Sequence, residues 1–181
     1  MVDYIVNRIF NSVTYIVPIN GQKDCYLVDC GDVELIISQG WQIKSVLLTH
    51  VHTDHIYGLN KLIDSFPNVS IYTNEYGKEA LLNPKLNFSR YHEDVDDFII
   101  TRPDNVVVIK EEGLLHLIGG NEINVLFTPG HDPSCLSYCV GGIVFTGDSY
   151  IPDVKIVTSL PKSKYFCITV LKLETFYSQA N

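Results

Sequence analysis

Three histidines and an aspartate stand within six residues of one another, directly after a largely apolar run over residues 43–48. The four residues are His50, His52, Asp54 and His55. Imidazole and carboxylate groups at this density are costly to bury unless something binds them, because each must otherwise be solvated or neutralised. The pattern therefore favours a metal site over a solvated, histidine-rich loop.

The spacing of these residues indicates how they could divide between metal ions. In an extended chain the side chains of His50 and His52 point the same way, so both can bind one ion. Asp54 and His55 can then turn toward a second ion. Neutral imidazole and carboxylate ligands suit zinc, and they also suit iron or manganese. We therefore expect one or two Zn²⁺ ions, with iron or manganese as alternatives.

The motif His50-x-His52-x-Asp54-His55 resembles the defining motif of the metallo-β-lactamase-fold hydrolases. Two later segments resemble further motifs of that family, in the family's order. Residues 128–131, Thr-Pro-Gly-His, are similar to the segment that supplies a third histidine to the first metal. Residues 146–148, Thr-Gly-Asp, are similar to the segment whose aspartate bridges two metals.

The resemblance implies a set of six metal ligands. They are His50, His52 and His131 for one ion, Asp54 and His55 for the second, and Asp148 as the bridge. Asp54 is also expected to be the catalytic residue that orients the nucleophile or relays its proton. Asp29 matches an Asp-x-Gly element of the family and is expected to support the metal ligands from behind, with an ordinary turn aspartate as the alternative.

Segments rich in β-branched and aromatic residues alternate with amphipathic segments, which predicts an α/β protein. Strands are expected over residues 3–10, 13–19, 25–28, 43–48, 69–73, 106–109, 114–118, 123–127, 136–140 and 143–145. Helices are expected over 33–39, with Asp32 as the cap, and over 57–66, 75–82 and 162–178. The resemblance implies a metallo-β-lactamase-like four-layer αββα sandwich, in which two mixed sheets pack face to face with helices outside.

Residues 83–103 interrupt this alternation with a long polar stretch that contains scattered aromatic residues. Loops of this length are usually functional or mobile. In the family the corresponding insertion lies over the metal cleft and influences substrate choice. The resemblance therefore makes Arg90, Tyr91 and His92 candidate substrate-binding residues, and a solvated surface insertion is the alternative.

One feature departs from the family pattern, because no histidine follows His131 in the sequence. Dinuclear members of the family have a last histidine ligand after a further helix. We therefore expect residues 1–181 to form a single metallo-β-lactamase-like domain that lacks the family's last strand or helix and its final ligand. Either the chain is short, or the second metal site is built differently.

Charge and composition limit the partners of the chain. A formal net charge of −8 without a run of basic residues argues against nucleic-acid binding. The sequence shows neither a signal peptide nor an apolar run of about 20 residues, so we expect a cytoplasmic protein that does not bind membranes. The five cysteines are expected to be reduced, and Cys135 and Cys139 are a weak metal signal only. The expected partner is a small-molecule substrate, and self-association into a homo-oligomer is left open.

The resemblance implies a metal-dependent hydrolase in which metal-bound hydroxide attacks a thioester or ester carbonyl. The chain looks most like the small hydroxyacylglutathione hydrolase (glyoxalase II)-like members, so a hydroxyacylglutathione-type or related small substrate is the first expectation. The first alternative is a mononuclear iron enzyme of the persulfide dioxygenase type. The second is a truncated or impaired, non-catalytic member with a weak second metal site.

Overall fold

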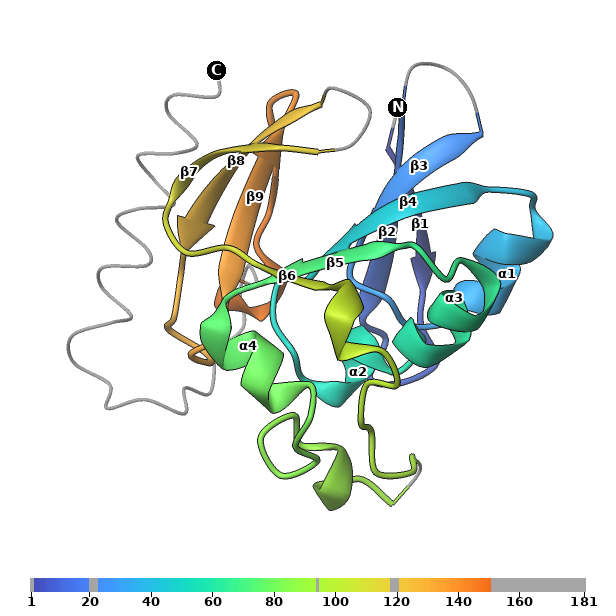
Figure 1. Cartoon of the computed structure of the whole chain (residues 1–181), viewed down its shortest axis with the longest axis vertical. Helices are drawn as coiled ribbons and strands as arrows, with labels where there is room; N and C mark the ends of the chain where they lie inside the picture. Colours follow the sequence, from blue (N-terminus) through green and yellow to red (C-terminus); the bar gives the residue numbers. More distant parts are fainter. Residues whose placement is uncertain (1, 20–22, 94, 118–120, 151–181) are drawn as a thin grey trace.

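The computed structural model describes residues 2–19, 23–93, 95–117 and 121–150 (Figure 1). Its strands are β1 Asp3–Val6, β2 Val13–Pro18, β3 Asp24–Val28, β4 Gln42–Leu47, β5 Ser70–Thr73, β6 Val106–Val108, β7 Gly113–His116, β8 Glu122–Phe127, β9 Leu136–Val140 and β10 Ile143–Phe145. Its helices are α1 Val33–Ser38, α2 Thr53–Ile56, α3 Leu59–Ser65 and α4 Glu75–Ala80, with 3-10 turns η1 Ser89–Tyr91, η2 Pro103–Asn105 and η3 Gly147–Ser149. No helix in these ranges is long and apolar enough to cross a membrane.

The strands form two sheets that face each other (Figure 1). The larger sheet is mixed and has the order β1-β2-β3-β4-β5-β6, antiparallel up to β3 and parallel from β3 to β6. The smaller sheet has the order β10-β9-β8-β7, and its described strands are antiparallel throughout. The resemblance implied two mixed sheets; the larger sheet is mixed, whereas the described strands of the smaller sheet pair antiparallel. Hairpin connections between successive strands produce the antiparallel order.

Strand β4 and the residue that follows it are buried on both faces. Val46 and Leu48 face a core shared with the helices, and Leu47 faces the core between the sheets. Side chains alternate across a strand, so one strand can contribute to both cores. The same alternation places Leu27 of β3 in the helix-side core and Tyr26 in the inter-sheet core. The larger sheet is therefore the middle layer between the helices and the second sheet.

Several boundaries differ from the predicted ones for identifiable reasons. The first strand ends at Val6 rather than Phe10, because residues 7–12 form a turn in which Phe10 has a φ of +53°. Asp32 precedes α1 but makes no side-chain cap, since its Oδ2 accepts the Arg8 N–H at 2.7 Å instead. The predicted helix over residues 162–178 lies outside the described residues. The expected helical layer over the smaller sheet can therefore not be followed in that part of the chain.

The Tyr138 hydroxyl joins the two sheets through a buried hydrogen bond to the Leu48 carbonyl, 2.8 Å long. We expect Tyr138→Phe to lower the free energy of unfolding by about 1–3 kcal/mol, because the carbonyl loses its partner. Tyr26→Phe is the matched control, since the buried Tyr26 hydroxyl has no hydrogen-bond partner among the described residues. It should be neutral or stabilising. Urea unfolding of the two variants measures the difference, and equal losses would contradict the prediction.

Candidate metal centre

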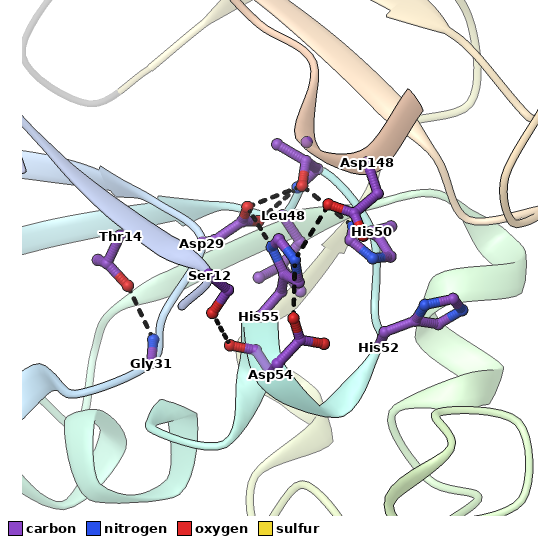
Figure 2. Close-up of polar contacts among 12 residues, drawn as sticks. Ser12, Thr14, Asp29, Gly31, Leu48, His50, His52, Asp54, His55 and Asp148 are labelled. Atoms are coloured by element: carbon purple, nitrogen blue, oxygen red, sulfur yellow. Dashed lines mark hydrogen bonds and ion pairs between the residues drawn. The ribbon is translucent and has the colours of Figure 1, made fainter. Parts of the chain in front are cut away.

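The cluster of histidines lies at the carboxyl end of β4, where the chain leaves the larger sheet (Figure 2). His50 and His52 occupy the extended segment that follows β4, and His52 has β-region dihedral angles. Asp54 and His55 then belong to the single turn α2. Two histidines in extended chain and two ligands on a helical turn therefore point into one region.

His50 is fully buried and has one ring nitrogen available to a metal. Its Nδ1 lies 3.2 Å from Thr49 Oγ1, and Thr49 Oγ1 donates to Asp29 Oδ2 at 2.7 Å. The hydroxyl proton is thus committed, so His50 Nδ1 carries the proton and Nε2 presents its lone pair. The buried Nε2 has no hydrogen-bond partner among the described residues. Burial lowers the pKa of His50 well below its usual value, with help from His55, and keeps the imidazole neutral, which metal binding requires.

His52 and His131 complete the first group of ligands. His131 Nε2 lies 3.0 Å from His52 Nδ1, and one ring nitrogen each of His50, His52 and His131 lie within 4.8 Å of one another. The other nitrogen of His52, Nε2, lies 3.4 Å from Asp132 Oδ2. The three imidazoles thus converge on one point, and the Asp132 carboxylate faces the outer side of His52.

The second group contains His50, His55 and Asp148, again within 4.8 Å. His55 Nε2 lies 3.2 Å from Asp54 Oδ2 and 3.6 Å from Asp148 Oδ1 (Figure 2). The other oxygen of Asp148 lies 3.8 Å from His131 Nε2. Asp148 therefore stands between the two groups, the position that a bridging ligand needs. Burial raises the pKa of Asp148, but contacts with His55 and the other histidines lower it below its usual value, which keeps the carboxylate ionised.

Asp29 supports this cluster from behind. Its Oδ1 accepts the Thr49 N–H at 2.8 Å, and its Oδ2 lies 2.8 Å from His55 Nδ1 (Figure 2). The residue is buried and has a φ of +61°, a conformation that a non-glycine residue adopts only when its surroundings hold it. Burial lowers the pKa of His55, but the carboxylates of Asp29, Asp148 and Asp54 together outweigh this effect and raise it well above the usual value. An ordinary turn aspartate does not make these contacts.

The loop that carries Asp148 fits closely against the histidine segment. Gly147 has a φ of +49°, and a Cβ atom placed on it would lie 2.2 Å from Thr49 Oγ1. A side chain at this position would therefore displace the hydroxyl that fixes the orientation of His50. The Thr-Gly-Asp motif thus has a steric reason for its glycine.

Sequence reasoning missed Asp132, although it lies next to His131. Its Oδ1 accepts from the Ser134 N–H at 2.8 Å and from the Ser134 hydroxyl, and Ser134 Oγ accepts the Val51 N–H at 3.1 Å. Burial raises the pKa of Asp132, but His52 and Ser134 lower it below the usual value. These contacts connect the His131 loop to the His52 segment. In the sequence, the one indication of this role was an acidic residue directly after a candidate metal-binding histidine.

The three candidate substrate residues lie in different surroundings. Arg90 is exposed and forms an ion pair with Asp97. The Tyr91 side chain is also exposed. His92 lines a cavity beside His52. Part of the insertion packs into the fold, because Asn87, Ser89 and Phe98 are among its buried residues.

The donors present fit one or two divalent metal ions. An unpartnered, buried imidazole nitrogen, two converging groups of ligand atoms and a carboxylate between them form a set that suits zinc, iron or manganese. Among the described residues, no cysteine belongs to either group. The ligand atoms border a cavity of about 490 Å³ that Asp54, His55 and Asp148 line.

Comparison with known proteins agrees with this geometry. The family model of the metallo-beta-lactamase superfamily matches residues 7–167. The chain therefore belongs to the metallo-β-lactamase superfamily.

Individual relatives and solved structures agree with this assignment. A probable metallo-hydrolase of Streptococcus pyogenes serotype M6 is 30% identical over 95% of this chain and 79% of its own length. A hydroxyacylglutathione hydrolase of Buchnera aphidicola (subsp. Acyrthosiphon pisum) is 25% identical over 83% of this chain, but the match spans only 59% of that relative. The crystal structure of BLEG-1 B3 metallo-beta-lactamase superposes with a TM-score of 0.84 at 23% identity, covering 100% of this chain and 87% of that one. This likeness shows the fold.

Proposed function

We propose that the chain is a metal-dependent hydrolase of thioesters or related esters. The observation that carries the proposal is the pair of ligand groups that share His50, with Asp148 between them. Two relatives whose names denote hydrolases support the reaction class. Thioesters suit a site without a strong general acid, because the thiolate leaving group has a pKa near 8.5.

The chain's own residues have distinct roles in this proposal. A divalent ion, with zinc as our proposal, would lower the pKa of a water molecule to about 7 and polarise the substrate carbonyl. His50, His52 and His131 would hold one ion, and Asp54, His55 and Asp148 would complete a second site. The Asp54 carboxylate, 3.2 Å from His55 Nε2, borders the cavity and would orient the nucleophile or accept its proton.

The test is thioester hydrolysis by protein reconstituted with Zn²⁺, followed through the released thiol. We expect activity on small acyl thioesters, its loss on chelation, its return when zinc is added, and its absence in His52→Ala. S-lactoylglutathione and a matched N-acetylcysteamine thioester tell whether the glutathione part contributes. A folded, metal-loaded protein that is inert toward all these thioesters and esters would contradict the proposal.

The same protein preparation also tests the two alternatives, the mononuclear iron oxygenase and the impaired, non-catalytic chain. Oxygen uptake with glutathione persulfide by the iron-loaded protein would indicate the mononuclear oxygenase. Elemental analysis that finds no bound metal after reconstitution would indicate the impaired chain. The match spans 59% of the length of the Buchnera hydroxyacylglutathione hydrolase, less than two thirds. Hydrolysis of hydroxyacylglutathione by this chain is therefore part of the proposal.

A further inference from the structure

Two phenylalanine side chains border the candidate metal centre, although they come from distant parts of the sequence. Phe10 lies in the turn between β1 and β2, and Phe88 lies in the insertion just before η1. Both line a cavity of about 280 Å³ together with His52, Asp54 and Asp148. Phe10 also lines the larger cavity of about 490 Å³. Its side chain thus stands at the boundary between the two spaces.

Both phenylalanines have a backbone conformation that bulky residues rarely adopt. The φ angles are +53° at Phe10 and +64° at Phe88, in the left-handed region that favours glycine. Asn11, next to Phe10, also has a positive φ of +54°. Strain of this kind persists only where the surroundings enforce it, and it concentrates at ligand sites. Two such outliers beside one centre therefore point to a function for the rings.

The turn that presents Phe10 is anchored to the metal centre itself. Asn7 donates its N–H to the Ser12 carbonyl at 2.8 Å, which closes the turn. The Ser12 hydroxyl donates to the Asp54 carbonyl at 2.7 Å (Figure 2). The Phe10 ring packs on the His92 ring, with the two centroids 4.9 Å apart. The position of Phe10 is thus fixed relative to a candidate metal ligand.

Buried polar residues hold Phe88 on both sides. The Asn87 side chain donates to the carbonyls of Ala80 and Phe98 at 2.9 and 3.0 Å. Ser89 Oγ accepts the Phe98 N–H at 2.8 Å. Both flanking residues are at most 1% exposed, whereas Phe88 itself is 37% exposed. The network therefore presents an apolar ring to solvent, at a ring distance of 4.7 Å from His52.

The charges around these rings exclude one kind of ligand and favour another. The described residues that line the two cavities include no lysine or arginine. Arg8 and Arg90, the nearest cations in the sequence, are paired with Asp32 and Asp97. A charged group on the acyl chain, away from the metal ions, would therefore meet no lysine or arginine among these lining residues, but it would meet carboxylates. An uncharged apolar group can pack on both rings without this penalty.

We propose that Phe10 and Phe88 are specificity-determining residues that hold the apolar acyl chain of an ester or thioester, with its carbonyl at the His50–Asp148 centre. The smaller cavity takes the acyl chain, and the larger one takes the leaving group. This assignment rests on the proposed hydrolase function and narrows it to substrates with uncharged, apolar acyl groups.

The test is a series of N-acetylcysteamine thioesters with acetyl, butyryl and hexanoyl groups and a constant leaving group. We expect kcat/KM to rise by about two- to fourfold for each added CH₂, because each one is removed from water against the rings. In Phe10→Ala the ratio of kcat/KM for hexanoyl over acetyl should fall by about tenfold. Phe88→Ala should lower the same ratio, with metal content measured because Phe88 contacts His52. Leu114→Ala, an exposed apolar residue of β7, is the matched control and should keep the ratio.

A second measurement does not depend on turnover. Calorimetry of acetate, butyrate and hexanoate binding to the metal-loaded protein should show tighter binding with chain length, and Phe10→Ala should remove the trend. A wild type that cleaves acetyl thioester without any chain-length preference would overturn the role of Phe10 and Phe88 in holding the acyl chain, while leaving the hydrolase function intact. Inertness toward every thioester, without chain-length-dependent carboxylate binding, would overturn both.

Discussion

His50→Ala should remove the metal ion that His50, His52 and His131 would hold, and it should leave the second ion with its own ligands. The physical reason is that the neutral His50 ring offers one lone pair, on the buried Nε2, which has no hydrogen-bond partner among the described residues. That lone pair can bind one ion only, whereas the two oxygens of the Asp148 carboxylate can bridge both. Hydrolysis should fall to the level of chelated wild type, since the ion that supplies the nucleophile would be lost.

Metal content by elemental analysis and thermal unfolding measure this effect without an activity assay. At a free metal concentration about 100 times the Kd, binding should stabilise the wild type by about 2.7 kcal/mol, or about 5–10 °C in Tm. His50→Ala should keep only the part of this gain that the second ion supplies. His116→Ala is the control, because His116 lies on the edge strand β7 with its side chain 69% exposed. Retention of two ions by His50→Ala would refute the role of His50 as a metal ligand.

Asp29→Asn should weaken metal binding by about 10–100-fold although Asp29 is not expected to touch the metal. The carboxylate accepts the Thr49 hydroxyl at 2.7 Å and lies 2.8 Å from His55 Nδ1. An asparagine has one oxygen only: placed at Oδ1 it leaves the Thr49 hydroxyl and His55 Nδ1 without an acceptor, and placed at Oδ2 it turns an NH2 group toward the Thr49 N–H. The His55 ring, and the His50 ring through Thr49, would then lose their fixed orientation. A buried donor without a partner should also lower the free energy of unfolding by about 1–3 kcal/mol.

Isothermal titration of Zn²⁺ into the metal-free variant measures the affinity, and urea unfolding measures the stability. Asp32→Asn is the matched control, because it makes the same chemical change three residues away. Asp32 contacts Arg8 rather than the histidine cluster, so zinc affinity should stay at the wild-type value. If Asp29→Asn binds zinc as tightly as Asp32→Asn, then Asp29 does not orient the ligands.

The sequence was most informative where the residue types and their spacing along the chain were enough to predict a structure. The density of imidazole and carboxylate groups over residues 50–55 predicted a metal site, and the structure brings these groups together with His131 and Asp148. The apolar run before them predicted a strand, which β4 confirms. The strands predicted over residues 136–140 and 143–145 match β9 and β10, and Gly141 and Gly142 between them have the positive φ that a tight hairpin turn requires.

Sequence reasoning was weaker where a side chain had competing partners. Asp32 has the residue type and position of a helix cap, but a backbone N–H from a turn 24 residues earlier takes its carboxylate. Arg90 has the charge expected of a substrate-binding residue, yet Asp97 pairs with it. Neither partner is visible as a periodic pattern, because the contacts depend on how turns fold back. The sequence therefore indicated what each side chain could do, but not which residue it would interact with.

By itself the sequence determined the ligand types, the order of the elements and the α/β class, since these follow from side-chain chemistry and from hydrophobic periodicity. Only the tertiary structure decided that His50 belongs to both ligand groups, that Asp132 faces His52, and that Phe10 and Phe88 border the same cavity. Phe10 and Phe88 are 78 positions apart, from 10 to 88, and both sit on strained backbone. Such positions oppose local preference, so long-range hydrogen bonds must hold them, and no local pattern in the sequence encodes those bonds.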